Sequence, residues 1–356
     1  MGVRVAVVGA TGAVGREMRR LLERSTLPLA GDPVYLASER SAGKRLPWRD
    51  GEVQVQAISA EAFDGIDLAL FSAGGARSRQ WAPTAAERGA VVIDNSSAFR
   101  MDDQVPLVVA EVNPGAAARR PKGIIANPNC TTMVLMVAAK PLHDAFGLTE
   151  MVTTSYQAAG GAGQSGITEL LAQTAAMLDD EPRLRSEGAV AEAAVAEAVP
   201  PEAFSRPIAF NVLAHCGSFT DARYTDEEFK LVNESRKILN LPALRVSPTC
   251  VRVPVVVGHG IAARMTFSRP VTRGEAMQAL EGAPGLSVVD GTGTDGEPLD
   301  YPTPLASAGI DEVLVGRVRE DLADPHSLNL WVVGDNLLKG AALNAVQLAE
   351  LVAAEG

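Results

Sequence analysis

The sequence predicts an α/β protein in which an N-terminal Rossmann-type, doubly wound domain precedes an α+β domain with a mixed sheet. An apolar run over residues 3–8 leads into a glycine-rich turn at 9–15, and helical periodicity follows it. Short apolar strands then alternate with helical segments up to about residue 126, as they do in parallel sheets. Beyond residue 131, strands of alternating polarity such as 151–156 indicate a mixed sheet.

Composition and length exclude several classes of protein. The 356 residues suffice for two domains, and a formal net charge of -11 argues against nonspecific binding of nucleic acid. No apolar run is long enough to span a membrane and no signal peptide precedes the first strand, so we expect a cytoplasmic protein. The cysteines Cys130, Cys216 and Cys250 form no CxxC motif, and we expect no metal site.

The glycine-rich turn predicts a dinucleotide site. Its glycines, Gly9, Gly12 and Gly15, are spaced GxxGxxG rather than GxGxxG. Because the turn joins a buried strand to a helix, the helix N-terminus would lie against a pyrophosphate. The glycines after the strand 67–71, at 74 and 75, predict a second close approach of backbone to a ligand.

The segment after the second strand bears on the choice of nucleotide. Arg40, together with Ser38 and Ser41, would bind a 2′-phosphate through charge-assisted hydrogen bonds. Glu39 would instead accept hydrogen bonds from the free ribose 2′-hydroxyl of NAD. Three groups compatible with phosphate against one carboxylate favour NADP.

Cys130 is the candidate nucleophile, because Pro128 ends the preceding segment and an apolar helix is expected over residues 133–139. A thiol at a helix N-terminus lies at the positive end of the macrodipole, which favours the reactive thiolate. Unpaired backbone N–H groups there would hold an oxyanion if Cys130 attacked a carbonyl carbon. The alternative is a buried cysteine that acts as a small hydrophobe.

Other charged and titratable residues lie where a ligand would bind. Arg100 follows a strand over 91–93 and suits an anionic substrate or a surface ion pair. Arg252 lies in an apolar strand expected over 251–257, so it must be paired or face a site. His259, between two glycines, is the best candidate of the four histidines to partner the thiol, the alternative being a structural histidine.

These segments resemble the aspartate-semialdehyde dehydrogenase family. The matching motifs cover nearly the whole chain in order: GATGAVG at 9–15, ASERSAGK at 37–44, LFSAGG at 70–75, DNSSAFR at 94–100, NPNCTT at 127–132, YQAAGGAG at 156–163, CVRVPV at 250–255 and GDNLLKGAALNAVQLAE at 334–350. The resemblance implies NADPH-dependent reduction of L-aspartyl 4-phosphate to L-aspartate 4-semialdehyde and phosphate. This reaction serves the biosynthesis of lysine, methionine, threonine and diaminopimelate.

The resemblance also implies roles for individual residues. Cys130 would attack the acyl phosphate and form a thioester, with His259 as the acid/base. The substrate-binding residues would be Arg100 and Lys230 for phosphate, Gln157 and Arg252 for the amino acid, and Asn129 and Glu227 as further contacts. The cofactor contacts would be Gly9, Thr11, Gly12, Ala13, Val14, Ser38, Arg40, Ser41, Ser72, Gly74, Gly160, Gly161 and Asn336. From spacing alone, Glu227 and Lys230 would be a surface pair on a helix over 226–239.

The same resemblance places the domain boundaries. The NADP-binding domain would comprise residues 1–130 with a C-terminal helix at 335–356, and residues 131–334 would form the catalytic domain that assembles a homodimer or homotetramer. Two alternatives stay open. One is N-acetyl-γ-glutamyl-phosphate reductase, which shares the layout, the cysteine and an acyl-phosphate substrate. The other is a nucleotide-binding paralogue without catalysis.

Overall fold

The structure, a computed structural model, describes residues 2–355 and divides into two compact units. Unit 1 comprises Met1–Pro141, Asn233–Ala243 and Leu337–Gly356, and unit 2 comprises Leu142–Val232 and Leu244–Asn336. Residues 1 and 356, the outer bounds of the expected first domain, lie outside the described residues. Two of the four points at which the chain passes from one unit to the other lie within helices, namely α3 (Cys130–Phe146) and α7 (Asp226–Leu239).

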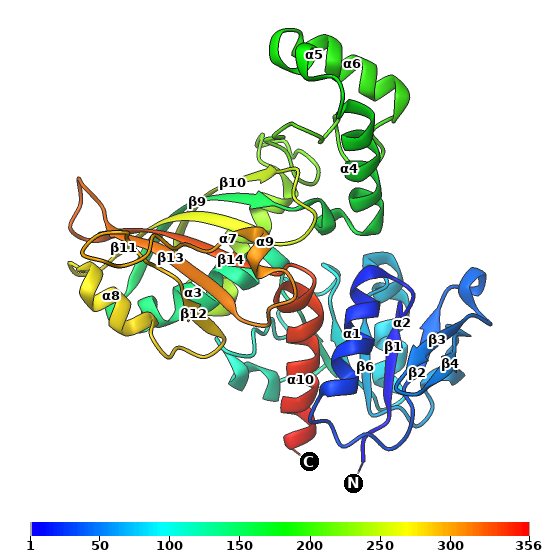
Figure 1. Ribbon diagram of the computed structural model, residues 1–356. Helices are drawn as coiled ribbons and strands as arrows, with labels where there is room; N and C mark the ends of the chain where they lie inside the picture. Colours follow the sequence, from blue (N-terminus) through cyan, green and yellow to red (C-terminus); the bar gives the residue numbers. More distant parts are fainter. Residues whose placement is uncertain (1, 356) are drawn as a thin grey trace. The chain divides into compact units, whose positions relative to one another are not determined.

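Unit 1 contains the predicted parallel sheet, with strand order β5-β2-β1-β6-β7-β8. Its central strand, β1, is a run of four buried apolar residues, as expected of a strand covered on both faces. Figure 1 shows this sheet among the blue and cyan elements. The strands are β1 (Val5–Val8), β2 (Val34–Ala37), β5 (Gln56–Ala57), β6 (Leu68–Phe71), β7 (Val91–Asp94) and β8 (Ile124–Ala126).

The strand order reverses at β1, which pairs with β2 on one side and β6 on the other. Helix α1 (Ala13–Arg24) follows β1, and helix α2 (Gly75–Glu87) follows β6. Ligands of doubly wound sheets bind beyond the carboxyl ends of the strands at such a reversal. This is where the glycine-rich turn and the 72–75 segment lie.

The C-terminal segment belongs to unit 1 and completes its core. A π-helical turn, η5 (Leu338–Ala342), leads into α10 (Leu343–Ala354). Leu348 and Ala345 of α10 join Leu22 of α1 and Val7 of β1 in one buried cluster. Figure 1 shows α10, in red, beside α1, in blue. Each buried leucine contributes about 1.5–3 kcal/mol relative to an exposed one, so this helix is integral to the unit.

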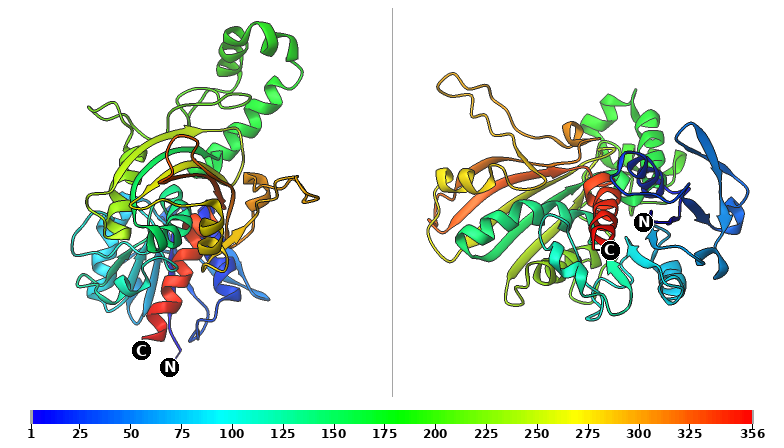
Figure 2. Two further views of the ribbon diagram at one scale, coloured as in Figure 1. Left: turned by 90° about the vertical axis from the view of Figure 1, so that its left-hand side faces the viewer. Right: turned by 90° about the horizontal axis from the view of Figure 1, so that it is seen from below.

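Some details of unit 1 differ from expectation. The sequence of residues 107–109 is apolar, as is typical of a strand, but Leu107 makes only an isolated bridge to Ala126. Helix α2 begins at Gly75, so the second of the two glycines after β6 belongs to the helix rather than to the turn. An unpredicted hairpin, β3 (Arg45–Trp48) and β4 (Gly51–Gln54), lies outside the main sheet (Figure 2), and short 3-10 turns are η1 (Glu39–Ser41), η2 (Glu61–Phe63) and η3 (Pro114–Ala118).

Unit 2 contains the predicted mixed sheet, with strand order β10-β9-β11-β14-β13-β12. Strand β9 pairs parallel with β10 and antiparallel with β11, whose other neighbour, β14, is also antiparallel. The strands are β9 (Leu148–Gln157), β10 (Arg245–Arg252), β11 (His259–Phe267), β12 (Leu286–Val288), β13 (Val313–Glu320) and β14 (Ser327–Gly334).

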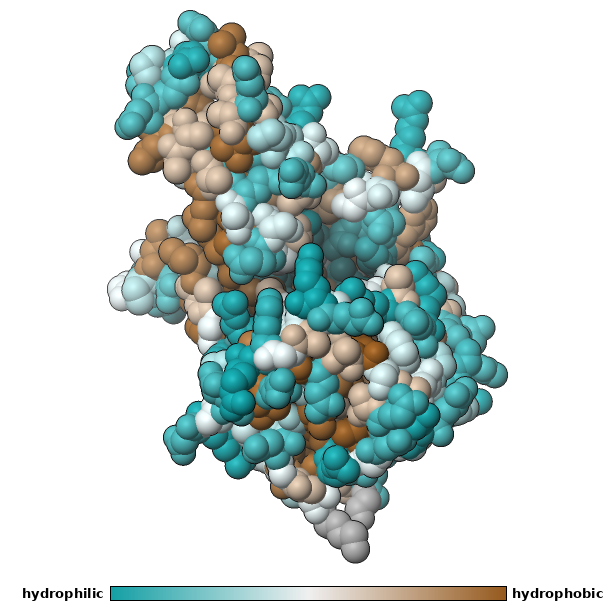
Figure 3. Space-filling view, turned by 90° about the vertical axis from the view of Figure 1, so that its right-hand side faces the viewer, coloured by the Kyte–Doolittle hydropathy of each residue, from teal (hydrophilic) through white to brown (hydrophobic). Residues whose placement is uncertain are grey.

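The helices of unit 2 are mostly at its surface. They are η4 (Ala159–Ala162), α4 (Gln164–Met177), α5 (Glu181–Ser186), α6 (Gly188–Ala198), α8 (Arg273–Leu280) and α9 (Pro304–Ser307), with the first part of α7. Helices α4 and α6 pack through Leu170, Ala191 and Val195. Apolar side chains still reach the surface around them, as the upper part of Figure 3 shows, with Leu178 and Val190 among them.

The expected strand over 251–257 is wrong beyond Arg252. Strand β10 ends at Arg252, and residues 253–258 form a turn before β11 begins at His259. Gly258 adopts a φ of +96°, and a Cβ there would lie 2.3 Å from the carbonyl oxygen of Pro304. A glycine is therefore required where this turn delivers His259 to β11.

Candidate active site

Cys130 is the first residue of α3, and Asn129 is the N-cap of that helix. The Asn129 Oδ1 atom accepts hydrogen bonds from the backbone N–H groups of Thr131, at 3.0 Å, and Thr132, at 3.2 Å. The Asn129 carbonyl also accepts the first helical hydrogen bond, from the N–H of Met133 at 2.8 Å. The predicted position of the thiol at the positive end of a helix is thus present.

The cap changes the prediction about the oxyanion. The N–H groups of Thr131 and Thr132 already have an acceptor in Asn129, so they are not the unpaired donors that we expected. Asn129, expected as a substrate contact, uses its side-chain oxygen to cap the helix. A hydrogen bond from its side chain to a substrate would have to be donated by the Nδ2 group.

Arg100 is buried and holds the segment before Cys130. Its Nε donates to the carbonyl of Asn127 at 2.9 Å, and its Nη2 donates to the carbonyl of Asn95 at 2.8 Å. Its Nη1 pairs with the carboxylate of Glu234 at 3.1 Å, and this guanidinium is only 10% exposed. Arg100 is therefore not the exposed surface ion pair that its position alone allowed.

Glu234 is a site residue that the sequence analysis missed. Its side chain is 2% exposed, and its second oxygen accepts from the N–H of Asn129 at 2.7 Å. A signal was available, because Glu227, Lys230, Glu234 and Lys237 recur at helical spacing along α7. A stripe of charges on one face of a helix is usually solvated, whereas Glu234 is buried.

In unit 2 the predicted residues His259 and Arg252 meet at Ala158. The N–H of Ala158 donates to Nδ1 of His259 at 3.0 Å, and the carbonyl of Ala158 accepts from Nη1 of Arg252 at 2.7 Å. One peptide group thus orients both side chains. Burial, assisted by the Arg252 cation, lowers the pKa of His259 to about 3. His259 is therefore neutral at physiological pH.

The Gly160-Gly161 turn lies against this pair. A Cβ on Gly161 would lie 2.6 Å from Nη1 of Arg252 and 3.3 Å from Nε2 of His259. A Cβ on Gly160 would lie 2.7 Å from the carbonyl oxygen of Val256. The absence of a side chain at Gly161 lets the backbone reach the histidine and the arginine, and its absence at Gly160 lets the turn pack against Val256. Asn336, another predicted contact, accepts from the N–H of Gly258 at 2.9 Å and is buried.

Gln157, Glu227 and Lys230 also come together in unit 2. The Gln157 amide donates to Oε1 of Glu227 at 3.4 Å, and Lys230 pairs with Oε2 of Glu227 at 3.0 Å. Burial lowers the pKa of Lys230, but the carboxylates of Glu227 and Asp226 outweigh it, so the net shift is upward. The pair expected from spacing is confirmed, yet Glu227 is buried rather than solvated.

The nucleotide turn in unit 1 is shaped for close approach of a ligand. A Cβ on Gly9 would lie 2.3 Å from the Ser72 carbonyl oxygen, and a Cβ on Gly15 would lie 2.2 Å from the Gly9 carbonyl oxygen. These two glycines let the turn pack tightly, whereas a Cβ on Gly12 would lie 3.4 Å from the Gly9 carbonyl oxygen and one on Gly74 would have no neighbour within 4 Å. A glycine-rich turn of this kind at the N-terminus of α1 suits the pyrophosphate of a dinucleotide. The other predicted contacts on these turns are Thr11, Ala13, Val14 and Ser72.

The segment expected to select the nucleotide forms the turn η1 after β2. Glu39 and Arg40 are exposed, and Ser41 is buried. Within residues 2–355 the Arg40 guanidinium has no ion-pair or hydrogen-bond partner, so it is available to a phosphate. Ser38 precedes the turn, and its carbonyl accepts a hydrogen bond of 2.8 Å from the N–H of Ser41.

Comparison with known proteins identifies the family. A model described as "Semialdehyde dehydrogenase, NAD binding domain" matches residues 4–119, and one described as "Semialdehyde dehydrogenase, dimerisation domain" matches residues 139–339. The aspartate-semialdehyde dehydrogenase of Corynebacterium glutamicum is 50% identical over 355 residues, with 98% of each chain covered. The chain belongs to the aspartate-semialdehyde dehydrogenase family.

Other members are similar along their full length. The enzyme of Aquifex aeolicus is 45% identical over 358 residues, covering 100% of this chain and 99% of the relative. The crystal structure of aspartate semialdehyde dehydrogenase II from Vibrio cholerae has a TM-score of 0.89 at 44% identity, covering 99% of this chain and 98% of that one. The aspartate-semialdehyde dehydrogenase resemblance and the predicted fold class are confirmed. The chain is an oxidoreductase with a nicotinamide dinucleotide site.

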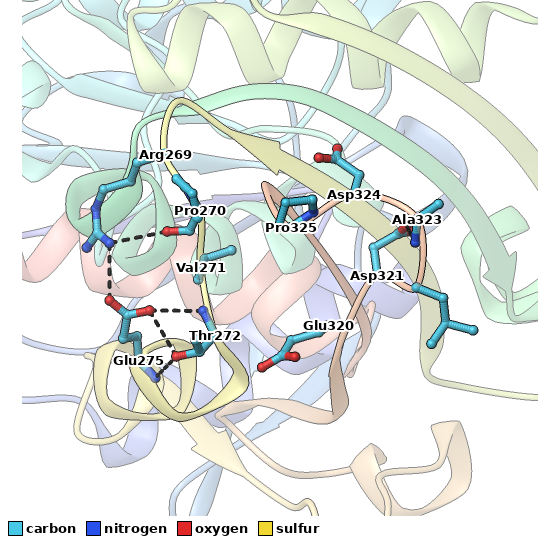
Figure 4. A pocket seen from close by; sticks show the side chains of 11 residues that line it. Arg269, Pro270, Val271, Thr272, Glu275, Glu320, Asp321, Ala323, Asp324 and Pro325 are labelled. Atoms are coloured by element: carbon cyan, nitrogen blue, oxygen red, sulfur yellow. Dashed lines mark hydrogen bonds and ion pairs between the residues drawn. The ribbon is translucent and has the colours of Figure 1, made fainter.

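Cavities elsewhere in the structure are lined by residues other than the predicted site residues. One of about 620 Å³ in unit 2 is lined by residues 269–272, Glu275 and residues 320–325 (Figure 4). The Glu275 carboxylate is already bound by Arg269 and by the backbone of Thr272. Among residues 2–355, no cluster of side chains has the composition of a metal site, and no helix is long and apolar enough to cross a membrane.

Proposed function

We propose that this chain catalyses the NADPH-dependent reductive dephosphorylation of L-aspartyl 4-phosphate to L-aspartate 4-semialdehyde and phosphate. The observation that carries the proposal is the position of Cys130 at the start of α3, with Arg100 bonded to the turn that precedes it. A thiolate is favoured there, and a cation for a leaving phosphate is at hand. The relatives from Corynebacterium glutamicum and Aquifex aeolicus are named aspartate-semialdehyde dehydrogenase, which supports the choice of the aldehyde. The reaction belongs to the biosynthesis of lysine, methionine, threonine and diaminopimelate in the cytoplasm.

The reaction begins with covalent catalysis by the thiolate of Cys130. The sulfur attacks the acyl carbon, a carbon–sulfur bond forms, and the carbon–oxygen bond to phosphate breaks. Arg100 and Lys230 hold the phosphate, whose negative charge increases as it leaves. The product on the enzyme is a thioester, which accepts hydride more readily than a carboxylate does.

Reduction of the thioester needs a hydride and a proton donor. The nicotinamide cofactor, held at the glycine-rich turn before α1, would be the source of the hydride. His259 would donate a hydrogen bond from Nε2 to the carbonyl oxygen as negative charge develops on it, because its Nδ1 already accepts from Ala158. The oxygen then expels the sulfur, which releases the aldehyde and restores the thiolate. Arg252 binds the substrate carboxylate, while Gln157, Glu227 and the Asn129 amide complete its binding.

The choice of NADP over NAD follows from Arg40. Its exposed guanidinium, with Ser38 and Ser41 in the same turn, suits a 2′-phosphate. Gly9, Gly12 and residues 11–14 would hold the pyrophosphate at α1. Ser72 and Gly74 would contact the cofactor after β6, and Gly160, Gly161 and Asn336 would complete its site.

The same chain would assemble into a homodimer through the mixed sheet of unit 2. Val152 and Tyr156 point to the same face of β9, and they are 42% and 37% exposed. Tyr156 packs edge-on against Trp331 of β14, with ring centroids 5.5 Å apart. A face of exposed apolar and aromatic side chains suits burial against a second copy. The matching family model carries the description "dimerisation domain".

The decisive experiment follows NADP reduction by the purified protein with aspartate semialdehyde, with and without phosphate, beside Cys130→Ala. Phosphate-dependent NADPH formation that is lost in the variant would support both the substrate and the acyl-enzyme. Turnover of N-acetylglutamate semialdehyde instead would keep the mechanism and change the substrate. Tight NADP binding without turnover of either aldehyde would favour the non-catalytic paralogue.

A further inference from the structure

Glu234 bonds to two functional groups of unit 1 at once. Its Oε1 pairs with Nη1 of Arg100 at 3.1 Å, and its Oε2 accepts from the N–H of Asn129 at 2.7 Å. Asn129 caps α3, and Cys130 is the next residue. A single rigid carboxylate therefore connects the guanidinium to the peptide directly before the nucleophile.

The contacts of Arg100 close a ring of hydrogen bonds through Glu234. The guanidinium donates to the carbonyl of Asn127, two residues before Asn129, and to the carbonyl of Asn95. The path from Asn127 to Asn129 along the backbone thus returns through Glu234 and Arg100. A shift of the Arg100 guanidinium would break its hydrogen bonds to the turn before Cys130. The guanidinium and this turn are therefore held in a fixed arrangement.

Helix α7 also fixes the backbone of Arg100. One turn after Glu234, the Nζ of Lys237 donates to the carbonyls of Arg100, at 2.8 Å, Asp102, at 2.8 Å, and Val105, at 2.9 Å. The helix therefore holds Arg100 at both ends, through its carbonyl and its guanidinium. An ordinary buried ion pair would account for the contact to the guanidinium, but not for the contact to the carbonyl of Arg100.

We propose that Glu234 is a positioning residue, which fixes Arg100 and the Cys130 turn in the arrangement that binds and releases phosphate. This inference rests on the proposed function, in which Arg100 holds the phosphate of the substrate. Glu234 itself touches no substrate, and it acts through Arg100 and through the Asn129 peptide.

The test is a double-mutant cycle of Glu234→Gln and Arg100→Gln, read as the KM for phosphate in the oxidation of aspartate semialdehyde. Glutamine can satisfy only one of the two donors, so E234Q should raise the phosphate KM about tenfold and leave the KM for the aldehyde within about twofold. In the R100Q background the same change should have less than about a twofold effect. Equal increments in both backgrounds would show a merely structural role and overturn the proposal.

Glu228→Gln is the matched control. Glu228 is also a buried carboxylate of α7 with two backbone donors, the N–H groups of Thr225 at 2.7 Å and Cys250 at 3.0 Å. Both of these donors belong to unit 2, whereas Arg100 and Asn129 belong to unit 1. An increase in phosphate KM in E228Q as large as that in E234Q would also contradict the proposal.

A second readout does not depend on turnover. Inorganic phosphate should protect Cys130 from iodoacetamide, and E234Q should require about tenfold more phosphate for half-protection. If phosphate protects Cys130 less well in E234Q, but the wild type oxidises no aldehyde, the proposed function is refuted. The inference that Glu234 positions the phosphate-binding residues would then still hold. Unchanged protection would refute the inference alone. If E234Q does not fold, Glu234→Asp, which is too short to bridge both donors, replaces it in each measurement.

Discussion

The backbone N–H of Ala158 donates a hydrogen bond of 3.0 Å to Nδ1 of His259. An imidazole nitrogen that accepts a hydrogen bond carries no proton, so the neutral ring has its proton on Nε2. The carbonyl of Ala158 accepts a hydrogen bond from Arg252, and the positive charge of Arg252 further disfavours protonation of the His259 ring. His259 is thus prepared as a neutral donor of one hydrogen bond.

The buried, neutral state of His259 predicts how stability depends on pH. Its pKa is about 3 in the folded protein against an ordinary value of 6.5, so between these values only the unfolded chain takes up the proton. Stability therefore rises with pH through this window and falls as the pH is lowered. From pH 7 to pH 5 the wild type should lose about 2 kcal/mol more than His259→Asn, as measured by urea unfolding. Equal losses in both proteins would contradict a depressed pKa.

Asn129 as the N-cap of α3 predicts a separation of stability from substrate binding. Asn129→Ala should lower the free energy of unfolding by about 1 kcal/mol, because Thr131 and Thr132 lose their acceptor. Asn129→Asp keeps a capping oxygen and should restore stability. If Nδ2 also binds substrate, the aspartate variant should still show a raised KM for the aldehyde. Urea unfolding that is unchanged in the alanine variant would exclude the cap as a stabilising feature.

Gly161 predicts a strict requirement for the absence of a side chain. In Gly161→Ala the new Cβ would lie 2.6 Å from Arg252 Nη1, so the guanidinium or the turn must move. We expect kcat/KM to fall by about 100-fold or more, since a displacement of about 1 Å at a reacting group costs that much. Gly188→Ala is the control, because a Cβ at Gly188 has no atom within 4 Å. Comparable activity of the two variants in the semialdehyde assay would show that the turn is not part of the site.

Arg40 predicts the cofactor preference. Arg40→Ala should raise the KM for NADP by about tenfold or more and leave the KM for NAD within about twofold, because only NADP carries the 2′-phosphate. Glu39→Gln should favour NADP slightly by removing a nearby negative charge. Lys44→Ala, at another exposed cation of the same segment, serves as the control. A loss of NADP affinity in K44A but not in R40A would show that Lys44, and not Arg40, binds the 2′-phosphate.

The exposed face of the mixed sheet predicts the assembly. Val152→Arg places a charge beside Arg264, its cross-strand neighbour on β11, where a second copy would bury both. We expect the variant to elute as a monomer in light-scattering chromatography while the wild type is a dimer. Leu305→Arg is the control, because Leu305 is 81% exposed and belongs to α9. A monomeric wild type, or a dimeric V152R, would place the interface elsewhere.

The local pattern of residues was enough to predict much of the fold. A buried apolar strand, a glycine-rich turn and a helix follow one another in unit 1, because each depends on neighbours in sequence. Helix α7 has the predicted bounds, Asp226–Leu239. The expected strand over 251–257 failed for a local reason too, since Gly258 at positive φ and the turn before it interrupt an apolar run that otherwise resembles a strand.

By itself, the sequence determined the fold class, the nucleotide turn, the thiol at the head of a helix and the family. Only the tertiary structure decided what each polar side chain bonds to. Glu234 lies 105 residues from Asn129, and its burial is not visible in a helix whose charges would ordinarily face water. The tautomer of His259 likewise depends on Ala158, 101 residues away in sequence. Periodicity predicts local conformation, whereas a hydrogen bond between distant segments depends on how those segments pack.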